Sequence, residues 1–216
     1  MDGVHLTTGP ARRGAPPRGE RLSREVVIAQ AARLIASDGL TAFSLRGLAE
    51  SLGVRPNALY NHVRNRDELL DAVTEEFVRG LRLPPGGPAW PEWTRAAAVS
   101  LRRQLVQRSG LTALALDRAG ATATGPRLLR EFIDRLVAGG VDRAVAHLAW
   151  HAVLTVVVGS LEPERAASPA GEETFAAVLD LTVAGIVSAA SEPPSAQARA
   201  LLDAHGAAAA PEPVRE

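Results

Sequence analysis

The sequence contains no cysteine and no lysine, and none of its apolar runs reaches the roughly 18 residues that a membrane-spanning helix requires. The absence of cysteine excludes a disulfide framework and a thiolate metal site. The first 24 residues lack the hydrophobic stretch of a secretory signal. We therefore expect a cytoplasmic protein with no membrane partner, no cofactor and no bound metal.

The formal net charge is zero, but the charges are unevenly distributed along the chain. Residues 1–66 hold ten arginines and five acidic residues, a net charge of +5, whereas the other 150 residues hold 14 arginines and 19 acidic residues, a net charge of −5. This asymmetry favours a small basic part that meets phosphates, joined to a larger part that does not. Chance combined with an arginine-bearing tail is the alternative interpretation.

After an N-terminal tail, the first 88 residues contain apolar residues at helical spacing. Residues 1–21 are rich in Gly, Pro and Arg, which predicts disorder. Beyond the tail, Ser or Asn precedes three of the four apolar patterns as an N-cap, and Gly follows two of them as a C-terminal stop. The N-caps are Ser23, Ser44 and Asn65, the stops are Gly39 and Gly53, and the predicted helices span residues 24–37, 45–52, 56–62 and 65 to about 81.

The stretch "GVRPNALYNHVRNRDELL", residues 53–70, gathers hydrogen-bonding groups on one short helix directly after a turn. Two short helices joined by a Gly-containing turn form the helix-turn-helix plan, in which the second helix enters the major groove of DNA. Val54, Leu59 and Val63 are expected to face inward. The expected outward residues are Arg55, Asn57, Ala58, Tyr60, Asn61 and His62. The alternative is a plain three-helix lid whose Tyr and His are half-buried core residues.

Residues 22–80 resemble the DNA-binding head of the tetracycline-repressor (TetR) family, on the motifs "SREVVIAQAARLIASDGL", "SLRGLAESLGV" and "LYNHVRNRDELLDAV". The resemblance is nearest to the branch that holds the tetracycline repressor itself. It implies that Arg46 contacts a base, that Arg66 binds phosphate, and that the recognition surface consists of Asn57, Ala58, Tyr60, Asn61 and His62. The proline at Pro56 stands one place earlier than in that branch, so the operator sequence cannot be carried over.

The remainder of the chain shows helical patterns and no strand-period segment. Helices are predicted over residues 91–108, 111–118, 127–138, 141–161 and 172–190. The predicted fold is therefore all-α, with a helix-turn-helix three-helix head (22–82), a C-terminal helical bundle that forms a regulatory domain (89–191) and a tail (192–216). In the family, the last two long helices meet their copies as a four-helix bundle, which implies a homodimer. Affinity favours a dimer independently, because two half-sites of a palindromic double-stranded DNA operator are then read together.

A small-molecule effector is expected in the bundle. His147 and His151 lie one helical turn apart, and three interpretations stay open: pocket-lining groups, core or dimer-interface residues, or a metal site. The family's tetracycline site uses a histidine where Arg82 stands, so an apolar or weakly polar effector is expected instead of tetracycline. The candidate ligand-binding residues are Trp93, Gln104, Leu105, Phe132, His147, Trp150 and His151.

The sequence thus predicts a DNA-binding transcriptional regulator, specifically a repressor that a small-molecule effector releases from its operator. An activator, or a regulator that needs no ligand, is the alternative with the same head. A helical enzyme is not favoured, because the sequence shows no nucleophile and base arrangement, no phosphate loop and no paired carboxylates.

Overall fold

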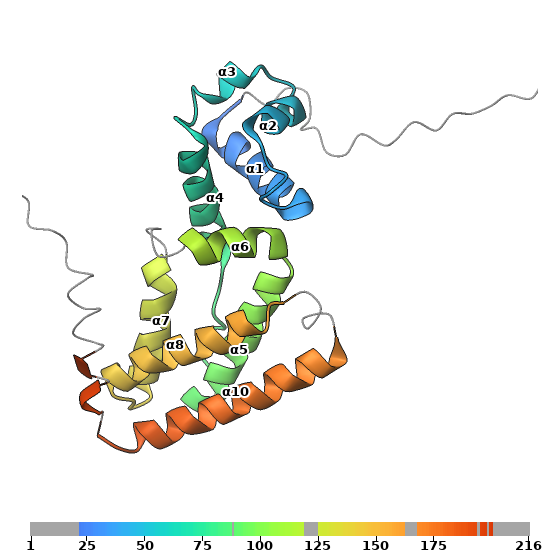
Figure 1. Ribbon diagram of the computed structural model, residues 1–216. Coiled ribbons are helices and arrows are strands. Elements are labelled where there is room, and N and C mark those ends of the chain that lie inside the picture. The colour runs from blue at the N-terminus through green and yellow to red at the C-terminus, as the bar shows by residue number, and fades with distance from the viewer. Residues whose placement is uncertain are drawn as a thin grey trace, which may run out of the picture. The chain divides into compact units, whose positions relative to one another are not determined.

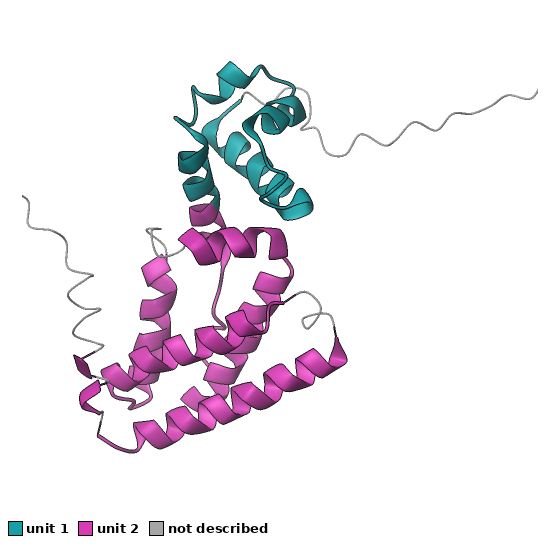
Figure 2. Cartoon of the chain, in the orientation of Figure 1, with its two compact units in different colours: residues 1–73 teal, residues 74–216 magenta. Residues whose placement is uncertain are grey.

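The computed structural model describes residues 22–87, 89–118, 125–162, 168–193, 195–197 and 199–200, and within these ranges all regular secondary structure is helical. The predicted all-α class is confirmed. The predicted tail 1–21, residues 201–216 and part of the segment after residue 162 lie outside the described residues. The chain divides into two compact units, Met1–Val73 (unit 1) and Thr74–Glu216 (unit 2) (Figure 2).

The first two helices of unit 1 begin and end where the sequence places their caps. Helix α1 spans Arg24–Asp38 and α2 spans Leu45–Leu52. The Ser23 hydroxyl accepts a hydrogen bond from the Val26 amide, and the Ser44 hydroxyl accepts one from the Gly47 amide. Such side-chain caps satisfy amides that have no partner inside the helix. Gly53 closes α2 with φ of 69°, a left-handed conformation that glycine adopts at low cost.

Helix α3 is shorter than the sequence predicts. It spans Pro56–Leu59, and the chain then turns, because the amides of His62 and Val63 both donate to the Leu59 carbonyl at 2.9 and 3.0 Å. The prediction that this helix continues to His62 is therefore wrong. The next helix, α4, spans Arg66–Gly80, and Asn65 caps it as predicted, since its side-chain oxygen accepts from the Glu68 amide at 2.8 Å.

A small apolar core holds the helices of unit 1 together. Phe43, which lies in the connector after α1, is buried beneath the helices, as are Leu59 and Val63. Val54, the third residue expected to face inward, is only half-buried. The buried apolar side chains of unit 1 are Val27, Ala31, Ile35, Phe43, Leu48, Ala49, Leu59, Val63, Leu69, Leu70 and Val73.

Unit 2 contains the C-terminal part of α4 and, in the described part of the chain, five further helices of ten or more residues (Figure 1). Helices α7 and α8 pack together, α5 packs against α8 and α10, and α8 and α10 run side by side in opposite directions (Figure 1). The five helices are α5 (Trp90–Val106), α6 (Ser109–Arg118), α7 (Gly125–Ala138), α8 (Arg143–Gly159) and α10 (Pro169–Ala190).

Aromatic side chains fill the centre of unit 2. The ring centroid of Phe132 lies 5.6 Å from that of Trp93 and 5.3 Å from that of Trp150, and all three side chains are buried. At the end of α7, a Cβ added to Gly139 would lie 2.7 Å from a ring carbon of Trp90. Glycine at that position therefore lets the Trp90 ring pack directly on the backbone.

Arg102 ties three helices of unit 2 together from a buried position on α5. Its guanidinium donates to the Ser160 hydroxyl at 3.1 Å, after α8, and to the Glu172 carboxylate at 2.6 Å, in the first turn of α10. The same group lies 4.8 Å from the centre of the Phe175 ring. Arg102 thus fixes one end of the α8 and α10 pair.

Helix α10 corrects one sequence-based expectation. Pro169–Ala190 has a mean hydropathy of 1.5 and is long and apolar enough, by length and composition, to cross a membrane. The expectation that no such run exists is wrong on that criterion. Only 22% of its apolar window is buried within the chain, and Leu181 is 75% exposed. The helix therefore presents apolar residues on its outer side as well as to the core.

Candidate nucleic-acid interface and effector site

The segment from Arg55 to His62 presents polar groups outward on an apolar anchor. Leu59 and Val63 are buried at 1% and 2% exposure, whereas the Tyr60 side chain is 53% exposed. The alternative in which this tyrosine belongs to the core is thus contradicted. Of the predicted recognition residues, Arg55, Asn57, Tyr60 and Asn61 are exposed, and Ala58 and His62 are half-buried.

The turn that carries Tyr60, Asn61 and His62 is fastened by charged groups. Arg24, at the start of α1, donates through Nη1 to the His62 carbonyl at 2.6 Å and to the Glu68 carboxylate at 2.9 Å. Glu68 also accepts from the Arg64 amide at 2.7 Å and from the Arg64 Nε at 3.0 Å. One carboxylate therefore joins the start of α1, the turn after α3 and the first turn of α4.

These contacts control the protonation of Glu68. Hydrogen bonds from the backbone and then the side chain of Arg64, with a further one from Arg24, lower the pKa of the Glu68 carboxyl to about 2. The carboxylate therefore stays ionised at any pH at which DNA binding is measured. Glu68 was not among the predicted site residues. The sequence signal for it is the Asn65 and Glu68 spacing of a capping box.

The two arginines assigned by family resemblance lie on α2 and α4. Arg46 is 86% exposed on α2 and pairs through Nε with Glu50 at 3.1 Å, one turn further along the same helix. Arg66 is exposed at the start of α4, with its guanidinium carbon 5.8 Å from the centre of the Phe43 ring. Both partners of this pair are exposed, at 86% and 67%, so the pair is weak and Arg46 can exchange Glu50 for a DNA group.

The predicted effector-binding residues divide into two groups in the structure. Trp93, Leu105, Phe132, His147 and Trp150 are buried in unit 2. Gln104 is half-buried and its side-chain amide exchanges hydrogen bonds with the backbone amide and carbonyl of Arg82 at 3.0 and 2.8 Å. His151 is exposed, and its ring centroid lies 5.0 Å from that of His147. The structure therefore brings together the aromatic residues, while Gln104 and His151 lie at the surface of the same unit.

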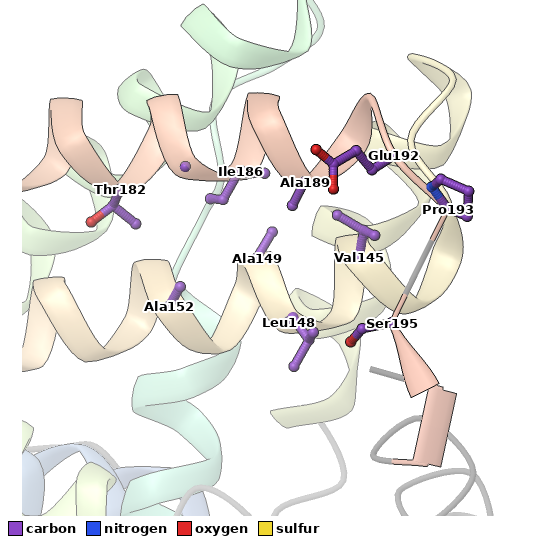
Figure 3. A pocket seen from close by; sticks show the side chains of 11 residues that line it. Val145, Leu148, Ala149, Ala152, Thr182, Ile186, Ala189, Glu192, Pro193 and Ser195 are labelled. Atoms are coloured by element: carbon purple, nitrogen blue, oxygen red, sulfur yellow. The ribbon is translucent and has the colours of Figure 1, made fainter. Parts of the chain in front are cut away.

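Two cavities lie between α8 and α10, and none of the seven predicted residues lines either one. The first, of about 330 Å³, lies between the start of α8 and the end of α10 (Figure 3), and the second, of about 730 Å³, lies between the end of α8 and the start of α10. Their sequence signal is the small residues of the two helices, which leave space between them. These include Ala149, Ala152 and Gly159 in α8 and Gly171, Gly185 and Ala189 in α10.

The metal interpretation of His147 and His151 requires a third ligand. No group of three or more His, Cys, Asp or Glu side chains with the geometry of a metal site occurs among the residues that the structure describes. The pair itself joins a buried ring to an exposed one on α8.

The exposed helix-turn-helix on a separate helical body defines a DNA-binding transcriptional regulator. Residues 27–73 match the bacterial regulatory proteins of the tetR family. Tetracycline repressor protein class C of Escherichia coli is 31% identical over 163 residues, which cover 71% of this chain and 71% of the relative. The chain belongs to the TetR family of transcriptional regulators. An HTH-type transcriptional regulator of Saccharopolyspora erythraea is 34% identical over 147 residues, which cover 66% of this chain but 61% of the relative, less than two thirds.

Solved structures show the same fold along most of the chain. A TetR variant from Acinetobacter baumannii AYE in complex with minocycline has a TM-score of 0.65 at 31% identity, covering 80% of this chain and 100% of that one. BioQ with its double-stranded DNA operator has a TM-score of 0.61 at 25% identity, covering 76% of this chain and 99% of that one. The similarity therefore extends beyond the helix-turn-helix into unit 2.

Proposed function

We propose that this protein is a transcriptional repressor that binds a palindromic operator as a homodimer and leaves it when a small-molecule effector binds unit 2. The observation that carries the proposal is the exposed segment from Arg55 to His62 on its buried anchor of Leu59 and Val63. A slim polar segment on an apolar base fits the major groove, which is about 12 Å wide. As a regulator of transcription, the protein acts in the cytoplasm, where the DNA is.

The proposed roles in DNA binding follow the chemistry of the exposed side chains. Arg46 and Arg55 pair with guanine, Asn57 and Asn61 with adenine, and the Ala58 methyl with a thymine methyl. Tyr60, His62 and Arg66 contact phosphate and fix the register of the segment on the duplex. The exposure of Arg46, Arg55, Asn57, Tyr60, Asn61 and Arg66 supports these assignments, and for the half-buried Ala58 and His62 the support is resemblance to the family motif.

The second copy is proposed to dock on the outer side of α8 and α10. Val178 and Leu181 are exposed apolar residues, and Leu148, Ala152 and Thr155 lie along the facing helix. Exposed apolar side chains that gather on a helix pair are typical of an interface between subunits. The two cavities between α8 and α10 then provide grooves for side chains of the partner. His151, exposed on α8, is expected near this interface.

The effector is proposed to bind beside the cluster of Trp93, Phe132 and Trp150, which α5, α7 and α8 contribute. The crystal structure of a variant relative at 31% identity is in complex with minocycline, which supports a small-molecule ligand for this chain. Effector binding there alters α4, which continues from unit 1 into unit 2. The fall in operator affinity is limited by the ratio of the effector's affinities for the DNA-free and the DNA-bound conformations.

A regulator that needs no effector is the second candidate, and one observation favours it. The aromatic side chains of Trp93, Phe132 and Trp150 pack directly against one another. An effector would have to separate them or occupy adjacent space. Titration of candidate compounds against tryptophan fluorescence decides between the two, with Trp90→Phe as the matched control for Trp93→Phe.

DNA selection tests the proposal directly. The full-length protein is incubated with a random duplex pool, bound DNA is enriched, and gel shifts are run at two salt concentrations. We expect a palindromic consensus whose affinity falls steeply with salt. Enrichment of no sequence, or binding without salt dependence, would refute the DNA-binding role. Adding a compound that quenches the tryptophans should release the enriched duplex if the protein is effector-responsive.

A further inference from the structure

The recognition turn lacks the support that a longer helix would give it. Helix α3 ends at Leu59, so Tyr60, Asn61 and His62 lie on a turn. Two hydrogen bonds close this turn, from the backbone amides of His62 and Val63 to the Leu59 carbonyl. A turn on the surface moves more freely than a helix packed on a core. The geometry of these three residues therefore depends on contacts from neighbouring elements.

Glu68 and Arg24 supply those contacts. The Glu68 carboxylate accepts the Arg64 amide, which follows the turn, and binds the guanidinium groups of both Arg64 and Arg24. Arg24 uses the same Nη1 to bind the His62 carbonyl within the turn. Charge-assisted hydrogen bonds of this kind are shorter and stronger than neutral ones. The carboxylate is thus the common partner of everything that closes the recognition turn from outside.

A simple helix cap does not account for this arrangement. In a capping box the acidic residue at the third position of the helix returns to the backbone amide of the cap residue itself. Here Asn65 is the cap, but Glu68 bonds the amide of Arg64, one residue earlier, and two arginine side chains as well. Capping alone requires neither arginine.

The arrangement also removes two positive charges from the set that can meet phosphates. Arg64 is 85% exposed next to the recognition turn, yet its guanidinium is held by the half-buried Glu68. A free arginine at such a place would add a phosphate contact to any DNA sequence, and phosphate contacts carry no sequence information.

We propose that Glu68 is a positioning and specificity-determining residue for DNA binding: it holds the turn of Tyr60, Asn61 and His62 in place for contact with the operator and withholds Arg24 and Arg64 from sequence-independent phosphate contacts. The inference rests on the proposed function, since it requires that this turn faces DNA. It assigns to an acidic residue beside the interface a role in discrimination between operator and other DNA.

Glu68→Gln tests the inference, with Glu76→Gln as the matched control. Glu76 lies on the same helix α4 and binds Arg79 at 2.8 Å, but it belongs to unit 2. Binding is measured on the duplex that the wild type enriches and on the random pool. For Glu68→Gln we expect operator affinity to fall about tenfold, which is the scale of one lost specific contact, and affinity for the random pool to rise. The slope of log affinity against log salt on the random pool should steepen by about 0.9 for each arginine released.

Two further variants separate positioning from a loss of folding. Arg64→Ala combined with Glu68→Gln should return the salt slope on the random pool towards that of the wild type. Arg24→Ala removes the bond to the His62 carbonyl and leaves the cap of α4 intact, so it should lower operator affinity with little change on the random pool. Circular dichroism melts check that each variant folds like the wild type.

The outcomes are distinct. An unchanged ratio of operator to random affinity in Glu68→Gln would overturn the inference, and so would an equal fall on both DNAs with an unchanged salt slope, which is the signature of a purely structural role. A change of the same size in Glu76→Gln would also overturn it. If the wild type itself enriches no sequence, it is the proposed function that fails.

Discussion

The two units of this protein use opposite means to present a surface. Unit 1 exposes polar side chains and fixes them with charged contacts, as in the bonds from Glu68 to Arg64 and Arg24. Unit 2 exposes apolar side chains on α10, such as Leu181, and fixes that helix through a buried core and the guanidinium of Arg102. The difference is the one expected for the two proposed partners, since DNA phosphates bind fixed polar groups, whereas a second protein chain packs on apolar area.

A large exposed side chain has a different significance in each unit. Tyr60 and Leu181 are both large exposed side chains. Tyr60 stands among arginine, asparagine and histidine on a short turn, while Leu181 stands among alanine, glycine and valine on a helix of 22 residues. The surroundings of an exposed residue, more than its exposure, therefore indicate what it meets.

The largest effect is expected from a charge placed on the apolar face of unit 2. Leu181→Arg should raise the dimer dissociation constant at least about 100-fold, because an unpaired charge would be buried in the interface. Operator affinity should fall with it, since two half-sites are no longer read together. Sedimentation measures the assembly. Val99→Arg, at another exposed apolar position of unit 2, is the control and should leave it unchanged. Dimers of Leu181→Arg with wild-type affinity would place the interface elsewhere.

A substitution in the core of unit 2 should affect stability, whereas a substitution on the recognition turn of unit 1 should affect DNA binding. Phe132→Ala removes the central ring of the aromatic cluster and should lower the free energy of unfolding by about 3–5 kcal/mol. Tyr60→Ala in unit 1 should leave stability nearly unchanged and weaken DNA binding. Guanidinium unfolding and gel shifts on both variants check this. A large loss of stability in Tyr60→Ala would contradict the exposed role of that side chain.

Within unit 1, the two assigned arginines should behave differently. Arg46→Ala should cost about 1–3 kcal/mol at one base pair of the operator and relax the preference there, as expected for loss of a base contact. Arg66→Ala should weaken binding to all sequences alike, as expected for a phosphate partner. The slope of log affinity against log salt should become shallower by about 0.9, the value for one phosphate contact. Binding to a panel of operators with single changes measures both. The same profile for the two variants would reject the assignment.

The smallest effect is expected from acid. The folded pKa of Glu68 is lowered to about 2, so its contribution to stability is complete above the usual carboxyl pKa of 4.5 and is lost as the pH falls towards 2. Thermal melts between these values should therefore show a loss of stability that is smaller in Glu68→Gln. Glu25, whose pKa is also lowered, chiefly by its backbone hydrogen bond, leaves a residual pH dependence in that variant. Identical pH profiles for wild type and Glu68→Gln would show that the carboxylate adds nothing to folding.

The sequence by itself determined the helices that local chemistry defines. Ser23, Ser44, Asn65 and Gly53 act on amides and backbone angles within a few residues, so α1, α2 and the start of α4 lie where these residues predict. The motif of the head also indicated the family, and residues 27–73 match it.

Only the tertiary structure decided the rest. The turn after α3 is bound by Arg24, which is 38 residues from His62 in the chain, and no local pattern reports such a contact. The same holds for Arg102, which joins α5 to residues 58 and 70 positions away. Caps and helical periods act between near neighbours, whereas the partners of a charged side chain are set by which distant segments the fold brings within about 3 Å.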